Sequence, residues 1–98
     1  MEITQKCKAY IGLAMRAGRV KFGVDAITEG KGHGPILMDE ALSDNAKSKL
    51  THHATTSQSP LFTVTGLPQA VSKDTCKAIQ VNDKELGKAV INALSAPK

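Results

Sequence analysis

Aromatic side chains are scarce in this chain of 98 residues, which has one tyrosine, two phenylalanines and no tryptophan. Many modules that bind single-stranded RNA stack its bases on exposed aromatic rings. The three rings present here, Tyr10, Phe22 and Phe62, are too few for such a platform once the core has used one of them. Any nucleic-acid binding must therefore depend on other groups.

Long apolar runs are missing as well. The longest begins at Ala9, ends at Met15 and includes Gly12, so it is far shorter than the roughly 20 residues that a membrane helix needs. Near the start of the chain, lysine and arginine residues interrupt every apolar stretch that could form the core of a secretory leader. We therefore expect no membrane segment, no secretory leader and a cytoplasmic location.

Cysteine is also sparse, because the chain has only Cys7 and Cys76. Two residues so far apart have no metal-like spacing, and reduced thiols in a cytoplasmic protein are a plainer interpretation than one disulfide. Cys7 lies on the apolar side of a predicted helix, which favours a packed thiol over a nucleophile.

The alternation of apolar and breaker residues predicts one helix followed by four strand–helix pairs. The first helix has apolar positions at helical spacing from Ile3 to Ala14 and ends before Gly18. Strands are predicted at residues 20–22, 35–38, 61–65 and 78–81. The other helices are predicted at residues 24–29, at 44–54 with Ser43 as N-cap, at 67–71, and after Asn82, which resembles the start of a capping box.

This order predicts the α/β fold class, and within it a three-layer α/β/α sandwich with a small four-stranded mixed sheet covered by helices on both faces. A hydrophobic content of 41% is sufficient for one core. The length of 98 residues leaves no room for a second domain, so we expect a single domain over residues 1–98.

Charge is distributed unevenly along the chain, which has a formal net charge of +4. Residues 1–24 carry five basic and one acidic residue, residues 25–46 carry one basic and five acidic residues, and residues 47–98 carry seven basic and three acidic residues. Such segregation can produce a one-sided field in the folded protein, so it favours a charged partner without identifying one.

Three polar motifs suggest ligand sites, but each has a simpler interpretation. The glycine cluster at residues 30–34 is followed by Pro35 and a strand, whereas a phosphate loop needs a lysine, a hydroxyl and a helix, so we expect a flexible connector. Asp39 and Glu40 follow a strand and point in opposite directions, which favours a solvated loop over a metal site. Neighbouring histidines at positions 52 and 53 diverge on a helix, which favours a surface pair. We therefore expect no metal, no cofactor and no enzymatic activity.

A basic set precedes the second predicted helix. Arg16, Arg19 and Lys21 lead into Gly23, which would place cations beside the backbone donors of a helix start, a combination suited to phosphate oxygens. From composition alone, an ordinary solvated basic face remains the simpler interpretation.

Three stretches resemble the family of ribosomal protein L-seven-Ae and L-thirty-e, and in particular its bacterial YlxQ-type branch. Residues 11–20 (IGLAMRAGRV) are similar to the branch's G-L-A-x-R-A-G-K/R run, and residues 41–50 (ALSDNAKSKL) to its D-A-S-x-N-T-K-K-K-L stretch. Residues 67–73 (LPQAVSK) are similar to L-G-x-A-x-G-K. The resemblance spans nearly the whole chain. It implies an α/β/α sandwich that binds structured RNA, often the kink-turn.

The chain departs from this family where RNA contact is expected. Family members that bind RNA carry Gly-x-Asn-Glu at the start of the second helix, and the corresponding residues here are Gly23, Val24, Asp25 and Ala26. An ionised aspartate only accepts hydrogen bonds and repels phosphate. In the third stretch, proline and serine replace two glycines, which restricts the backbone.

The resemblance implies a non-enzymatic RNA-binding protein that is ribosome-associated and recognises RNA by its shape. In that reading Leu67 and Pro68 lie against an exposed nucleotide, and the basic residues neutralise phosphate. The residues expected to contact RNA are Arg16, Arg19, Lys21, Gly23, Val24, Asp25, Leu67, Pro68 and Lys73. The alternative is a protein-interaction module on the same fold, which contacts a basic partner through the acidic span from Asp25 to Asp44.

Overall fold

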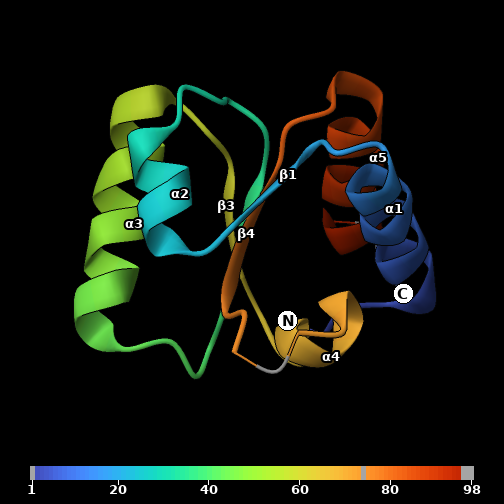
Figure 1. Cartoon of the computed structure of the whole chain (residues 1–98), viewed down its shortest axis with the longest axis horizontal. Helices are drawn as coiled ribbons and strands as arrows, with labels where there is room; N and C mark the ends of the chain where they lie inside the picture. Colours follow the sequence, from blue (N-terminus) through green and yellow to red (C-terminus); the bar gives the residue numbers. More distant parts are fainter. Residues whose placement is uncertain (1, 74, 96–98) are drawn as a thin grey trace.

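The computed structural model describes residues 2–73 and 75–95, and their elements follow the predicted order (Figure 1). The helices are α1 (Gln5–Arg16), α2 (Val24–Glu29), α3 (Asp44–Ser57), α4 (Leu67–Val71) and α5 (Lys84–Ser95). The strands are β1 (Val20–Phe22), β2 (Ile36–Asp39), β3 (Leu61–Val64) and β4 (Ala78–Val81). None of the described helices is long and apolar enough to cross a membrane.

The four strands form one mixed sheet in the order β1-β4-β2-β3. Strands β2 and β3 are parallel, whereas β4 is antiparallel to both of its neighbours, β1 and β2. Strands β1, β2 and β3 therefore run in the same direction and end at the same edge of the sheet. We call this edge the carboxyl edge.

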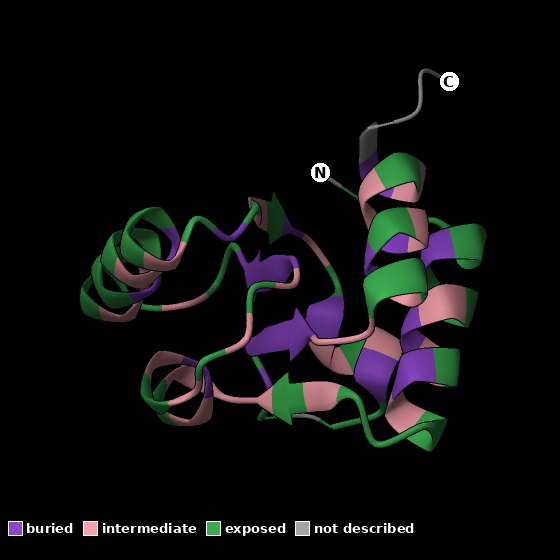
Figure 2. Ribbon diagram, turned by 90° about the horizontal axis from the view of Figure 1, so that it is seen from above, coloured by how far each residue is buried: buried purple, intermediate pink, exposed green. Residues whose placement is uncertain are grey.

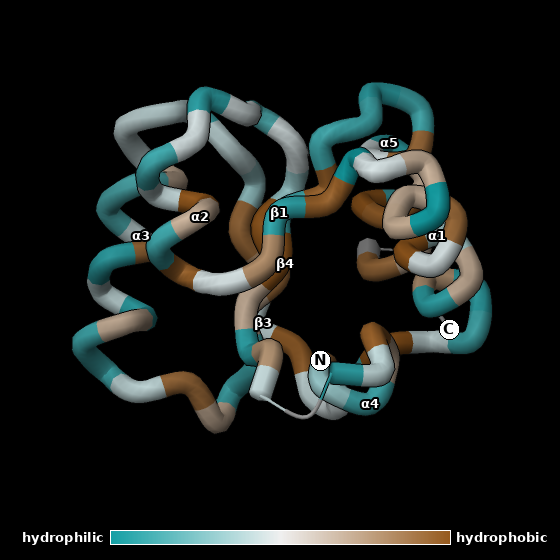
Figure 3. The backbone as a smooth tube through the Cα atoms, viewed as in Figure 1, coloured by the Kyte–Doolittle hydropathy of each residue, from teal (hydrophilic) through white to brown (hydrophobic). Residues whose placement is uncertain are grey.

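Helices cover both faces of the sheet, which confirms the predicted sandwich. Helices α2 and α3 lie on one face, and α1, α4 and α5 lie on the other (Figure 1). The side chains of β2 alternate between the two layers, because Leu37 joins the cluster under α1 and α5 while Ile36 and Met38 join the cluster under α2 and α3. Burial and hydrophobic residues are accordingly concentrated along the sheet and on the inner helix faces (Figures 2 and 3).

One of the two predicted helix N-caps is confirmed. The hydroxyl of Ser43 accepts the N–H of Ala46 at 3.2 Å, as predicted for the start of α3. The prediction for α5 is wrong by one residue, because Asp83, and not Asn82, accepts the N–H of Leu86 at 2.9 Å. The first helical residue is Lys84, so the residue in the N-cap position is Asp83.

The glycine cluster is a connector, as predicted, but it is held firmly against β4. The side-chain amide of Gln80, which is fully buried, donates to the carbonyl oxygens of Gly34 at 3.0 Å and Gly32 at 3.2 Å. A Cβ atom on Gly34 would overlap the carbonyl oxygen of Val81, so only glycine fits at this position. Internal hydrogen bonds and close packing thus hold Gly32 and Gly34 against β4, which the sequence did not indicate.

Candidate nucleic-acid interface

Helices α2, α3 and α4 all begin at the carboxyl edge, since each follows a strand that ends there. Gly23 joins β1 to α2 with a φ of +92°, a conformation that L side chains rarely adopt. Its N–H donates to the carbonyl oxygen of Ala78 at 2.9 Å, which ties the start of α2 to the first residue of β4. Val24 and Asp25 form the first turn of α2, and the carboxylate of Asp25 is exposed.

The loop after α4 lies against the same edge. The ammonium group of Lys73 is 4.9 Å from the centroid of the Phe22 ring, which is within the range of a cation–π interaction. Ser72 ends α4 in the left-handed conformation with a φ of +57°. The structure therefore brings the segment from Phe22 to Asp25 together with Lys73, although about 50 positions of sequence separate them.

Asp39 connects the end of β2 to the start of α4. Its side chain is buried, and its two carboxylate oxygens accept the N–H of Ala41 at 2.9 Å and the N–H of Leu67 at 3.1 Å. The expectation that Asp39 belongs to a solvated loop is wrong, because these two N–H groups compensate for the removal of the carboxylate from water. Glu40, the next residue, is exposed as expected.

Leu67 does not belong to the interface. Its side chain is fully buried and packs in the core cluster that also contains Val64 and Val71. The prediction that Leu67 lies against an exposed nucleotide is therefore wrong, because the first residue of α4 points into the core while Asp39 holds its N–H. Pro68, at the next position, is half-buried and sits in the first turn, where proline is tolerated.

The basic residues of the first segment are spread along β1 and the turn before it. Arg16 and Arg19 precede β1, whereas Gly23 follows it, so they lie at the opposite end of this strand (Figure 1). The carbonyl oxygen of Arg19 accepts the N–H of Asn82 at 2.7 Å, which places the turn beside the start of α5. Lys21 is exposed in the middle of β1.

The acidic span contributes less surface charge than its sequence suggests. Asp25, Glu29, Glu40 and Asp44 are exposed, but the carboxylate of Asp39 is buried and fully used by backbone donors. A protein partner at this span would therefore meet separate carboxylates on α2 and at the start of α3.

Both cysteine thiols are buried inside the fold. Cys7 and Cys76 are free and buried, and burial raises the pKa of both thiols, that of Cys7 to about 11. A thiol in this environment is a poor nucleophile at neutral pH. Within residues 2–73 and 75–95, no group of three histidine, cysteine, aspartate or glutamate residues could hold a metal ion. His52 is exposed and His53 half-buried on α3, as expected for a surface pair.

Neither a family model nor a curated protein sequence matches this chain. Among solved structures, the chain is similar to one titled "The structure of a protein with unknown function from Bacillus halodurans C", with a TM-score of 0.77 and 23% sequence identity. The superposition covers 93% of this chain and 98% of that chain. At this level of identity the similarity shows a common fold.

Proposed function

We propose that this chain is a non-enzymatic RNA-binding protein, cytoplasmic and ribosome-associated, that recognises structured RNA of the kink-turn type at the carboxyl edge of its sheet. The observation that carries the proposal is the contact of Lys73 with Phe22 at 4.9 Å. It joins the two segments, the start of α2 and the loop after α4, that the family resemblance assigns to RNA.

Each group at this edge has a distinct role in the proposed complex. Lys73 and Lys21 neutralise phosphates. Gly23 has no side chain above the start of α2, so an RNA backbone can come close to the N–H groups of Val24 and Asp25. The carboxylate of Asp25 accepts hydrogen bonds from a ribose 2′-hydroxyl or from the amino group of a base, since it can only accept.

The hydrogen bond of Gly23 with Ala78 and the packing of Lys73 on Phe22 hold the two segments in a fixed relation. RNA would thus meet a preformed surface, and recognition would depend on the shape of the RNA more than on individual bases. This mode of binding needs no aromatic platform, which agrees with the three aromatic residues of the chain.

The experiment is a titration of the protein with a kink-turn RNA and with an unstructured RNA of the same length, at two salt concentrations. We expect the kink-turn RNA to bind more tightly, and Lys73→Ala to weaken its binding about fivefold to tenfold and to lower the salt slope by about one phosphate contact. Lys88→Ala removes an exposed lysine of α5, which begins at the opposite edge of the sheet, and is the matched control. Equal, weak binding of both RNAs would overturn the proposal. Partners captured from lysate that survive ribonuclease treatment would then favour the protein-interaction alternative.

A further inference from the structure

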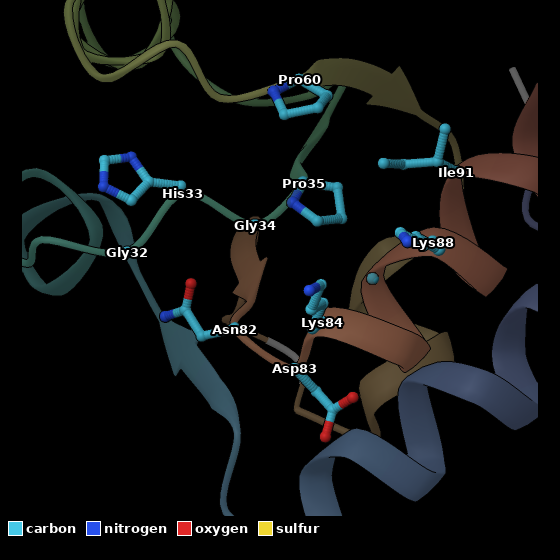
Figure 4. A pocket seen from close by; sticks show the side chains of 11 residues that line it. Gly32, His33, Gly34, Pro35, Pro60, Asn82, Asp83, Lys84, Lys88 and Ile91 are labelled. Atoms are coloured by element: carbon cyan, nitrogen blue, oxygen red, sulfur yellow. The ribbon is translucent and has the colours of Figure 1, made fainter.

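A hollow of about 370 Å³ lies at the opposite end of the molecule, between the glycine connector and the start of α5 (Figure 4). This volume is within the range of small-molecule sites. None of the residues expected to contact RNA lines it. The lining residues are Gly32, His33, Gly34, Pro35, Pro60, Asn82, Asp83, Lys84, Gly87, Lys88 and Ile91.

The walls of the hollow are fixed by backbone contacts. The connector is held by the amide of Gln80, and the carbonyl oxygen of Pro35 accepts the N–H of Val81 at 3.0 Å. On the opposite wall, Gly87 is buried against Pro35, and a Cβ atom there would come within 3.1 Å of the proline ring. The hollow is therefore preformed, and a ligand could bind in it without a change in the conformation of the connector.

The chemistry of the hollow combines an apolar surface with positive charge. Pro35, Pro60 and Ile91 supply the apolar part, and Lys84 and Lys88, one helical turn apart on α5, are the two cations at its rim (Figure 4). Among the described residues of the lining, Asp83 carries the one carboxylate, which points away from the hollow and accepts the N–H of Leu86. The hollow thus fits a ligand with a flat apolar part and a negative charge.

One further side chain adds polar recognition. Asn82 also lines the hollow, but its side-chain oxygen is buried against Gly32 and is closed to a ligand. The Nδ1 of His33 lies 2.9 Å from the carbonyl oxygen of Ser57, which it can reach only as a donor, so the ring is fixed at the rim with Nε2 as its second polar atom.

We propose that this hollow binds a nucleoside monophosphate. The base lies on Pro35, Pro60 and Ile91, and the phosphate lies between the ammonium groups of Lys84 and Lys88. A base supplies the flat apolar part, and the phosphate matches two cations in charge. The nucleotide can be free or can be the terminal residue of an RNA strand.

The test is a titration of the intact protein, followed by amide chemical shifts, with adenosine monophosphate, adenosine, inorganic phosphate and a short single-stranded RNA that carries a 5′-phosphate. We expect adenosine monophosphate to shift the amides of Gly34, Asn82 and Gly87, and to bind about tenfold or more tightly than adenosine or phosphate alone. An RNA that shifts the same amides at lower concentration than the mononucleotide identifies a strand end as the source. Binding of the mononucleotide alone identifies the free nucleotide.

The double variant Lys84→Ala, Lys88→Ala should weaken binding of adenosine monophosphate about tenfold or more, while Lys49→Ala should leave it unchanged. No shift at the hollow at millimolar nucleotide would overturn the inference, and so would equal shifts from phosphate alone. The inference is independent of the proposed kink-turn site, because Lys73→Ala should weaken kink-turn binding and leave nucleotide binding unchanged.

Discussion

Asp39 is the residue on which the geometry of the carboxyl edge depends most. Its carboxylate accepts two backbone N–H groups, and one of them opens α4. We expect Asp39→Ala to lower the free energy of unfolding by about 3 kcal/mol, because two charge-assisted hydrogen bonds are lost and two donors remain unpaired. Asp39→Asn should lower the free energy of unfolding by roughly half as much, since the side-chain amide keeps one oxygen that can accept a backbone N–H. Urea unfolding measures both.

Glu40→Ala is the control for this series, because it removes an exposed carboxylate from the next position. Its effect should be within about 0.5 kcal/mol. Equal losses for Asp39→Ala and Glu40→Ala would show that the buried carboxylate does not stabilise the edge.

The role of Asp39 could not be predicted from the sequence, because Leu67 is 28 positions away. The same holds for Gln80, whose partners Gly32 and Gly34 are more than 40 positions away in the chain. Local spacing identifies an apolar or polar face, but it does not identify the distant donor that a buried polar group will meet. The burial of Leu67 could not be predicted from the sequence for the same reason.

Substitution by alanine should have opposite effects on the free energy of unfolding at two glycines, one in a helix and one in the connector. Gly12 lies inside α1, and an added Cβ would meet no atom within 4 Å, so Gly12→Ala should stabilise the fold by about 0.5–1 kcal/mol through helix propensity. Gly34→Ala would drive a methyl group into the carbonyl oxygen of Val81 and should destabilise the fold by about 2 kcal/mol or more. Thermal unfolding of both variants measures the difference. Changes of the same sign would contradict the packing described for the connector.

The elements themselves were largely predictable because each carries a local signal. The strands around Phe62 and Ile79 have runs of β-branched and apolar residues, and Ser43 precedes a helix with the expected cap. Helix α3 continues to Ser57, three residues beyond the prediction, because its last turn is polar and shows no periodicity. The position of β4 between β1 and β2 could not be predicted, since strand order depends on pairing between distant segments.

The fold divides the basic residues of the sequence between two ends of the molecule. Arg19 lies beside the start of α5, whereas Lys73 lies at the carboxyl edge. We therefore expect Arg19→Ala to change the affinity for kink-turn RNA by no more than about twofold, through long-range electrostatics alone. The measurement is the same RNA titration, with Lys73→Ala beside it. A loss with Arg19→Ala as large as that with Lys73→Ala would mean that RNA spans both ends.

The buried thiols make the stability of the whole molecule sensitive to alkaline pH. Burial raises the pKa of Cys7 from an ordinary value of 9.0 to about 11, so between these values the unfolded chain loses a proton that the folded chain retains. The free energy of unfolding should therefore be at its full value below pH 9 and fall as the pH rises toward 11. Urea unfolding as a function of pH measures this loss, which should be smaller in Cys7→Ala.

Alkylation of the native protein should be slow at neutral pH and become rapid only on unfolding. A free energy of unfolding that stays constant from pH 8 to pH 11, or a fast-reacting Cys7 in the folded protein, would contradict this packing of α1 on the sheet.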